Sequence, residues 1–344
     1  MSTIYDVARL AKVSPATVSR VLNGVRTSPK STQAVLAAVE KLGFVPNRNA
    51  QRLRTRESEL IAMLIPDIEN RFYTKMVRAV EDTARAEGYA VMLCNTDDDP
   101  VKEAEYLDAV IREPVAGIIS APANDATSFS LARLRRVPVV TVDRRARTEE
   151  FDSVIIDNVT GVESGIGLLA ARGYRRIACI TGPEGIETAD DRAEGWRRGV
   201  WNLTGRMPEP NFLERTSFSF EGGAQAVETL LRLPEPPDAI FAANNRLAVG
   251  AIRELHSRGY TDGQIGMLSF GELWFMLDLP KGVIVADLPE YGMGMIAARM
   301  LLERIKGDGS PVRRVVLPPT IADSAESSES PADRVVVPLR KGSA

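Results

Sequence analysis

Apolar residues recur at helical spacing in three short segments at the start of the chain, over about residues 4–10, 15–22 and 29–42. The apolar positions are Ile4, Val7, Ala8 and Leu10, then Val18, Val21 and Leu22, then Val35, Leu36, Val39 and Leu42. The middle segment, SPATVSRVLNG, begins with an N-cap serine and a proline at the first helical position, and it ends at Asn-Gly. Helices this short are unstable alone, and the tight Ala-Lys-Val link between the first two predicts a helix-turn-helix.

From residue 60 the pattern changes to short, continuous apolar runs. The runs are LIAMLIP, YAVMLCN, VAGIISA, VPVVTVD and DSVIID, and later RRIACITG, NFLERTSFSF, DAIFAAN, IGMLSFG and GVIVADL. Helices are predicted in FYTKMVRAVEDTARAEG and VKEAEYLDAVIRE, and around residues 195–203, 223–233 and 245–258. This alternation indicates parallel sheets covered on both faces. Two successive halves of similar size predict two lobes, with a ligand cleft beyond the C-terminal ends of the strands.

Charge separates the two regions. Residues 1–57 contain ten Lys or Arg and three Asp or Glu, a net charge of +7, whereas the rest of the chain has 33 against 43, a net charge of −10. A basic head on an acidic body is typical of a nucleic-acid-binding module, because neutralising phosphates supplies most non-specific affinity. The alternative is a helical bundle that merely caps a larger domain.

Composition limits the remaining possibilities. With 344 residues and 44% hydrophobic composition, the chain is expected to form more than one core. No apolar run is long enough to span a membrane and MSTIYDV does not resemble a signal peptide, so a cytoplasmic protein is expected. Cys94 and Cys179 are expected to be buried rather than disulfide-bonded. The single histidine, His256, cannot build a metal site with them, and no cofactor or metal is expected.

The motifs IYDVARLAKVSPATVSRVLNG, LGFVPNRNAQRLRT, LIAMLIPDIENRFY, DRAEGW and FAANN occur in order along the chain. Together they closely resemble the lactose-repressor (LacI/GalR) family of bacterial transcription regulators, over nearly the whole chain and more weakly after about residue 318. The resemblance implies an α/β protein with an N-terminal three-helix helix-turn-helix head. It also implies a two-lobed body like that of periplasmic binding proteins, built on two parallel doubly wound sheets.

The resemblance places the second helix in the major groove of DNA. Pro15 and Ala16 then offer only apolar contacts, whereas Arg20 is the best candidate for bidentate recognition of guanine. Lys12, Asn23 and Arg26 are expected to contact the DNA backbone, with ordinary surface placement as the alternative. The full set of expected DNA-binding residues is Thr3, Ser14, Pro15, Ala16, Thr17, Ser19, Arg20, Asn23, Arg26, Asn47, Ala50, Leu53 and Arg54.

PNRNAQRLRT resembles the hinge helix of the family, which orders on operator DNA. Leu53 is then a wedge in the minor groove, since unstacking a base step is offset by a bent duplex that meets nearby arginines. The alternative is a leucine packed against the body. Arg48 and Asn49 stand where small or apolar residues are common in the family, so they depart from its pattern.

The resemblance also implies effector contacts in the cleft. The expected residues are Arg71, Phe72, Tyr73, Asp143, Thr188, Arg192, Phe218, Asn244 and Glu272. Aromatic rings with paired donors and acceptors are suited to a polyhydroxylated sugar. Arg192 is the strongest candidate, and a solvated ion pair with its acidic neighbours is the alternative.

The expected pocket departs from the family pattern at residues that bear on the chemistry of the effector. Family members often have an aspartate where this chain has Gly271 and Glu272, and Arg71 stands where proline is usual. Removing a negative group and adding a positive one suggests a sugar acid or sugar phosphate. Alternatively, Glu272 reaches into the cleft and restores the carboxylate.

The predicted function is therefore a transcription regulator, expected to be a repressor, whose operator binding responds to a sugar or sugar derivative. An enzyme is the first alternative, but no GxSxG motif occurs, and GMGMIA at residues 292–297 is only an isolated match to a dinucleotide fingerprint. The second alternative is a body that binds a protein partner, which predicts an exposed apolar patch and no ligand-sized cleft.

The predicted domains are a helix-turn-helix head (1–46), a hinge helix or linker (47–57) and a body for effector binding and dimerisation (58–322). The N-lobe is expected at about 58–157 and 286–316, the C-lobe at about 158–285 and 317–340, and a flexible tail at 323–344. A homodimer on a pseudo-palindromic operator is expected, and a tetramer is not, because the C-terminus has no amphipathic heptad segment.

Overall fold

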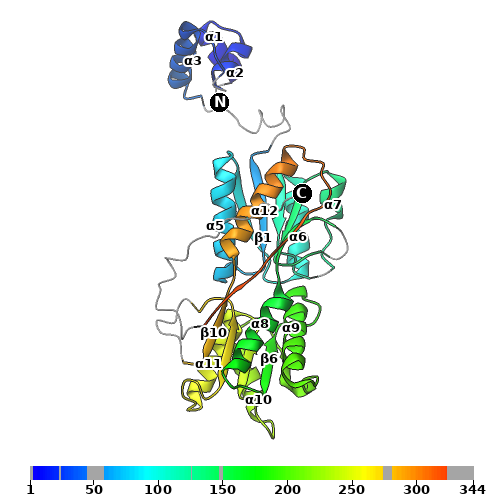
Figure 1. Ribbon diagram of the computed structural model, residues 1–344. Helices are drawn as coiled ribbons and strands as arrows, with labels where there is room; N and C mark the ends of the chain where they lie inside the picture. Colours follow the sequence, from blue (N-terminus) through cyan, green and yellow to red (C-terminus); the bar gives the residue numbers. More distant parts are fainter. Residues whose placement is uncertain are drawn as a thin grey trace. The chain divides into compact units, whose positions relative to one another are not determined.

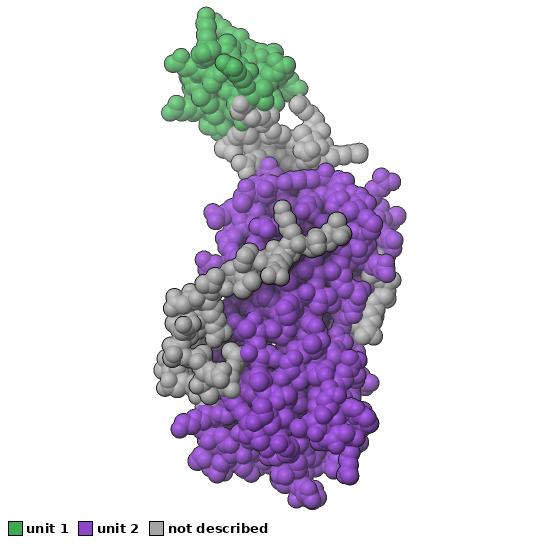
Figure 2. Space-filling model, in the orientation of Figure 1, with its two compact units in different colours: residues 1–58 green, residues 59–344 purple. Residues whose placement is uncertain are grey.

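The computed structural model describes residues 3–22, 25–44, 58–124, 126–146, 150–273 and 281–323 of the protein. These fall into two compact units, residues 1–58 and 59–344, which are coloured separately in Figure 2.

The first unit consists of the three predicted helices, α1 (Ile4–Ala11), α2 (Pro15–Leu22) and α3 (Pro29–Leu42). Their buried side chains form one small core, made of Val7, Ala8, Val18, Val35 and Ala38. Two positions assigned to the apolar faces are instead exposed, Leu10 by 42% and Leu36 by 54%. The apolar faces predicted for α1 and α3 were therefore too wide, because three short helices enclose only one narrow core.

Capping residues set the ends of these helices. Thr3 and Asp6 form a capping box at the start of α1, and Ser14 Oγ accepts a hydrogen bond of 3.2 Å from the Thr17 N–H at the start of α2. Between them, Lys12 has a left-handed backbone with φ of 53°. This turn directs α2 away from α1 and completes the predicted helix-turn-helix.

The second unit begins with a six-stranded parallel sheet in the order β11-β5-β4-β3-β1-β2. Its strands are β1 (Leu60–Ile65), β2 (Ala90–Asn95), β3 (Gly117–Ser120), β4 (Val139–Val142), β5 (Asp152–Ile156) and β11 (Arg314–Leu317). Helices α5 (Arg71–Ala86) and α12 (Glu290–Ile305) pack against one face, and α6 (Pro100–Arg112) and α7 (Ser130–Leu134) pack together elsewhere in this first lobe. Figure 1 shows α5 and α12 side by side over the sheet.

The second lobe repeats this plan with the strand order β12-β10-β9-β8-β6-β7. Its strands are β6 (Ile177–Thr181), β7 (Leu213–Arg215), β8 (Ala239–Ala242), β9 (Gly266–Phe270), β10 (Val283–Asp287) and β12 (Thr320–Asp323). Its helices are α8 (Asn158–Ala171), α9 (Glu187–Thr204), α10 (Phe220–Leu231) and α11 (Asn245–Ser257), with a 3-10 turn at Pro210–Phe212. β12 runs antiparallel to β10, so this sheet is not wholly parallel as predicted. Asp323, the first residue of the predicted tail, pairs with Ile284 in this strand.

The chain passes between the lobes three times, after β5, after β10 and between β11 and β12. The last crossing also explains why β12 is antiparallel. β11 runs toward the second lobe, and the chain continues directly into β12, so β12 begins at the end of the second sheet where its parallel strands finish. Cys94 and Cys179 are buried and free, as predicted. In the described part of the chain, no helix is both long and apolar enough to cross a membrane.

The GMGMIA match to a dinucleotide fingerprint lies inside α12 and not in a loop between a strand and a helix. A side chain at Gly294 would clash with the backbone carbonyl of Met76 on α5. The glycine therefore permits close packing of two helices, and the segment does not form a phosphate-binding loop.

Candidate functional site

A pocket lies between the lobes, where loops and helix starts follow the C-terminal ends of the strands. Its volume of about 70 Å³ is room for several water molecules, at roughly 10–15 Å³ each. All nine effector residues expected from the sequence line it. They come from both lobes, because Arg71, Phe72, Tyr73 and Asp143 follow strands of the first lobe whereas the other five belong to the second.

Asp143 lies at the centre of the first-lobe wall and is only 4% exposed. Its Oδ2 accepts a hydrogen bond of 2.8 Å from the Tyr73 hydroxyl, whereas its Oδ1 has no hydrogen-bond partner within the described residues. The backbone is left-handed at this residue, with φ of 63°. Burial raises the pKa of the Asp143 carboxyl, and it raises the pKa of Tyr73 well above its usual value, so the phenol keeps its proton and donates.

Arg192 from α9 is buried on the second-lobe side, with 6% of its surface exposed. Its Nε donates to Asn158 Oδ1 at 2.8 Å and its Nη1 donates to the Ala243 carbonyl at 2.9 Å. The guanidinium lies 4.7 Å from the centre of the Phe270 ring, and Nη2 lies 3.9 Å from Asp143 Oδ1 across the cleft. The alternative of a solvated surface ion pair is therefore wrong.

Arg144 is a pocket residue that the sequence analysis missed. It is 4% exposed, and its Nη1 donates to Asp98 Oδ1 at 2.5 Å and to the Pro122 and Ala123 carbonyls. Its Nε has no hydrogen-bond partner within the described residues. A buried acceptor on Asp143 and a buried donor on Arg144 are thus both left unsatisfied beside the pocket, and such groups are costly unless a ligand or solvent meets them.

Glu272 and Glu290 line another part of the pocket, and the Lys75 ammonium lies beside them. Lys75 Nζ lies 2.6 Å from Glu272 Oε2, across the lobes, and 3.6 Å from Glu290 Oε2. Glu272 lines the pocket, as the alternative for this residue predicted. Burial raises the pKa of Glu290 to about 7, although Lys75 acts to lower it. Two carboxylates in this part of the pocket therefore share one neighbouring ammonium group.

Asn244 and Phe218 are also held by local structure. Asn244 Oδ1 caps α11 by accepting a hydrogen bond of 2.8 Å from the Leu247 N–H, which leaves its amide nitrogen for a ligand. Phe218 packs over Gly182 so closely that any side chain at residue 182 would clash with the ring.

Further lining residues that the sequence did not indicate are Asp67, Asn70, Asp98, Asn245, Phe270, Leu288 and Glu290. Several directly follow apolar runs, which is the signal that could have found them.

Two more charged pairs join the lobes around the pocket. Arg246 on α11 pairs with Asp67, which follows β1. Arg145 donates from its backbone N–H and its Nε to the carboxylate of Glu187, at 2.6 and 2.5 Å, and Glu187 is 3% exposed. The two lobes are therefore held together by direct contacts as well as by the three crossings.

In the first unit, Pro15, Ala16, Arg20 and Arg26 are exposed. Thr3, Ser14 and Thr17 use their hydroxyls in helix caps, with Ser14 Oγ and Thr17 Oγ1 2.9 Å apart, and Ser19 is half-buried. The remaining residues expected at DNA, namely Asn23, Asn47, Ala50, Leu53 and Arg54, lie outside the described residues, as do the hinge departures Arg48 and Asn49.

A three-helix unit with a helix-turn-helix, and a two-lobed α/β unit with a polar and aromatic pocket, together define a ligand-responsive DNA-binding protein. Residues 3–47 match the model of bacterial regulatory proteins of the lacI family, and residues 58–328 match that of periplasmic binding proteins and the sugar binding domain of the LacI family. The chain belongs to the LacI family and is a DNA-binding transcription regulator.

Individual relatives agree with this assignment. The ribose operon repressor of Halalkalibacterium halodurans is 33% identical over 308 residues, 89% of this chain and 91% of the relative. The repressor CytR of Escherichia coli strain K12 is 30% identical over 311 residues, 89% of this chain and 90% of CytR. Among solved structures, the Lac repressor bound to ONPG in its repressed state is 25% identical, with a TM-score of 0.81 over 94% of this chain and 98% of that one. All three relatives are named as repressors.

Proposed function

We propose that this regulator represses transcription as a homodimer on a pseudo-palindromic operator, and that a sugar bound between the lobes controls its occupancy of the operator. The observation that carries the effector proposal is the pair of buried, unsatisfied polar atoms beside the pocket, Asp143 Oδ1 and Arg144 Nε. A sugar hydroxyl both donates and accepts, so adjacent hydroxyls satisfy a carboxylate and a guanidinium together.

The charges of the pocket favour a neutral sugar over an anionic one. Arg144 is paired with Asp98, Lys75 with Glu272, and Arg192 is held by Asn158 and the Ala243 carbonyl. These cations already have acceptors, and Asp143 lies 3.9 Å from Arg192 Nη2 and 3.8 Å from Arg144 Nε, so their charges are balanced within the pocket. The Asp143 Oδ1 atom, which has no hydrogen-bond partner in the described residues, can accept from a sugar hydroxyl. A sugar acid or sugar phosphate, suggested by Arg71 and the missing aspartate, remains the alternative. A structure similar to this chain is that of CelR with cellobiose, which supports a carbohydrate.

The mechanism follows from the lining of the pocket. Its residues come from both lobes, and charged pairs such as Arg145 with Glu187 join the lobes around it, so a sugar bound there contacts both lobes at once. Its contacts then set the angle between the lobes, and the angle sets the separation of the two heads in the dimer. A coupling free energy of about 1–3 kcal/mol changes operator occupancy 5- to 150-fold. Because the operator lies on the chromosome, we place the protein in the cytoplasm.

At the operator, we assign the reading of bases to the start of α2. Pro15, Ala16 and Arg20 are exposed there, whereas Ser14 and Thr17 have cap partners and so contact DNA mainly through the helix N-terminus. The wedge role of Leu53 is retained as part of the proposal, on the resemblance of its segment to the family hinge.

The test is a thermal-shift screen against neutral sugars, sugar acids, sugar phosphates and nucleobases. Ligand at 100 times its Kd stabilises the protein by about 2.7 kcal/mol, so a true effector raises the melting temperature measurably. We expect a neutral sugar to do so in the native protein and to fail in Arg192→Ala and Asp143→Asn. Arg198→Ala is the matched control, because Arg198 is exposed on the same helix and pairs with Glu194.

Two other results of the thermal-shift screen would change the proposed ligand. A shift confined to acids or phosphates supports the anionic alternative. No shift in any class contradicts the sugar proposal and favours a body that binds a protein partner.

A further inference from the structure

The last strand of the first sheet, β11, leaves one edge open. Ser153 N donates to the Arg313 carbonyl and Asp157 N donates to the Leu317 carbonyl, both at 2.9 Å, so odd-numbered residues face β5. The backbone groups of Arg314 and Val316 therefore face outward. They have no hydrogen-bond partner in the part of the chain that the structure describes. An open edge of this kind is a template for another strand.

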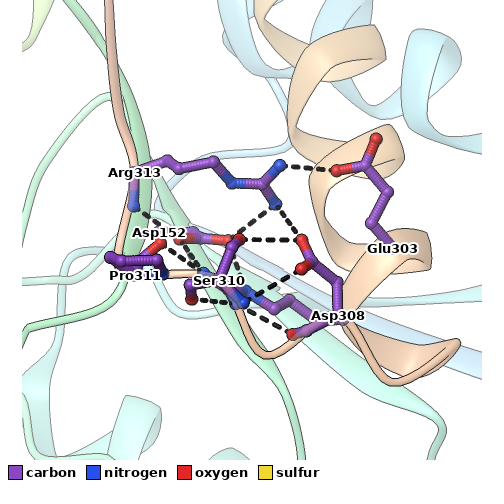
Figure 3. Close-up of polar contacts among 7 residues, drawn as sticks. Asp152, Glu303, Asp308, Ser310, Pro311 and Arg313 are labelled. Atoms are coloured by element: carbon purple, nitrogen blue, oxygen red, sulfur yellow. Dashed lines mark hydrogen bonds and ion pairs between the residues drawn. The ribbon is translucent and has the colours of Figure 1, made fainter.

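This edge is held rigidly by the loop that precedes it, shown in Figure 3. Arg304 donates through Nε and Nη2 to both oxygens of Asp152 at 2.8 Å, and also to the Ser310 and Pro311 carbonyls. The Arg313 N–H donates to Asp152 Oδ1 at 2.8 Å. Asp152 is 3% exposed, and hydrogen bonds from Arg304 and Arg313 lower its pKa even though burial acts to raise it. These contacts fix the start of the strand against β5 and α12.

A groove adjoins the start of the same strand, where Arg314 lines it. Thr141, Ser153 and Arg314 lie in register across β4, β5 and β11 and form its floor, and Phe151 and Val312 line it as well. Its volume of about 590 Å³ is far larger than that of the effector pocket by the same measure. Val312 is 51% exposed and Val316 is 48% exposed, so apolar side chains lie open beside an open edge.

The chain itself contains a matching segment outside the described residues. β11 and the residue after it read Arg-Val-Val-Leu-Pro at 314–318, and Arg-Val-Val-Val-Pro recurs at 334–338. The ten residues 324–333 can span roughly 33–36 Å, at about 3.3–3.6 Å each. The end of β12 lies six residues beyond Leu317, about 20 Å along an extended chain. The segment can therefore return to β11, and it arrives from the Leu317 end.

We propose that residues 334–338 bind along the free edge of β11, antiparallel to it, with valine side chains covering Val316 and the groove. The antiparallel direction follows from the side of arrival, and an antiparallel edge strand on a parallel sheet is a common arrangement. Pro338 then falls at the end of the pairing, where a missing N–H is tolerated. In this arrangement one segment anchors the tail that the sequence analysis predicted to be flexible. Because β11 continues into β12 of the other lobe, the bound segment braces one lobe crossing.

Hydrogen exchange tests the proposal in the full-length protein. We compare the native chain with a variant ending at Asp323 and with a matched control ending at Arg340, which keeps the repeated segment. Peptides covering β11 are expected to exchange at least tenfold faster in the shorter variant than in the other two. Peptides covering β2, the opposite edge of the same sheet, report whether the fold is intact and are expected to be unchanged. Equal exchange of β11 in all three proteins overturns the proposal.

Disulfide trapping identifies the occupant. Val316→Cys is combined in turn with Val335→Cys, Val336→Cys and Val337→Cys, and the native cysteines are buried and do not compete. Leu134→Cys, exposed on α7, replaces Val316→Cys in the control. Bonds within one chain, absent in the control, support the proposal. Bonds only between chains mean that a second copy occupies the edge, and no bond means that neither does; both results overturn the proposal.

Discussion

At the scale of single residues, Glu290 is a buried carboxyl whose charged form the fold disfavours. It is 6% exposed at the start of α12, and burial raises the pKa of its carboxyl to about 7 from an ordinary 4.5, although Lys75 lies 3.6 Å away. The folded protein therefore holds this proton to higher pH than the unfolded chain does. Stability falls as pH rises from about 4.5 to 7, and the full penalty, about 3 kcal/mol, persists above pH 7.

Glu290→Gln is expected to remove that penalty. We expect the free energy of unfolding to rise by about 2–3 kcal/mol at pH 8 and to stay nearly unchanged at pH 4, in urea titrations at both values. Lys75 keeps Glu272 as its nearer partner in this variant. Glu87→Gln, an exposed glutamate paired with Lys306, is the control and should change little at either pH. An equal gain at both pH values would contradict the assigned cause.

Arg20 is the residue on which base recognition is expected to depend most. It is exposed on α2 and is the only arginine of that helix. We expect Arg20→Ala to weaken operator binding by about 1–3 kcal/mol and to relax the preference at one base pair, measured by fluorescence anisotropy on single-substitution operators. Lys41→Ala, at the end of α3, is the control. A uniform loss on every DNA sequence would instead assign Arg20 to phosphate contact.

Single residues were predictable where a motif carried them. The nine pocket residues were found through the family resemblance, since the same positions follow the same strands. Arg144, Lys75 and Glu290 were not found, because their role depends on which loops the two sheets bring together. Glu290 is 215 residues from Lys75 in sequence, and nothing in either local pattern indicates that they meet.

At the scale of elements, the contact between α5 and α12 makes a sharp prediction. Gly294 faces the Met76 carbonyl with no room for a side chain, whereas the nearest atom to a side chain at Gly292 is 4.0 Å away. We expect Gly294→Ala to lower the free energy of unfolding by about 1–3 kcal/mol through overpacking. Gly292→Ala should raise it by up to about 1 kcal/mol, because alanine favours the helix. Urea unfolding of both variants measures the difference, and equal effects would mean that helix propensity alone decides.

The elements that the sequence could predict are those with a clear local pattern of apolar residues or caps. Strands such as β1 and β9 are continuous apolar runs, and helices such as α1 and α3 have caps, so both were located closely. α8 and α12 were not among the predicted helices, and the glycines of α12 were compared with a dinucleotide fingerprint. Gly165 in α8 instead allows close contact with Leu268 of β9. The antiparallel direction of β12 depends on where β11 ends in space, which no local pattern encodes.

At the scale of the whole body, direct ion pairs across the cleft set how easily the lobes part. Arg145 with Glu187, Arg246 with Asp67, and Lys75 with Glu272 each join one lobe to the other. Glu187 is buried, so its pair loses more on breaking than an exposed pair does. In the proposed mechanism these pairs are exchanged for contacts with solvent when the cleft opens, and they add to the energy by which an effector holds it closed.

Glu187→Gln therefore tests whether lobe closure and effector binding are coupled. The carboxylate lies outside the effector pocket, but losing its bond to Arg145 lowers the fraction of molecules whose lobes are closed. Apparent effector affinity falls in proportion to that fraction, so a shift of about 1–2 kcal/mol weakens it by at most 5- to 30-fold. Calorimetric titration with the sugar found by thermal shift measures the change, and small-angle scattering measures the accompanying expansion of the body. Glu184→Gln, exposed three residues earlier, is the control. Unchanged affinity together with an expanded body would separate closure from binding, and the effector would then have to act on the operator by another route.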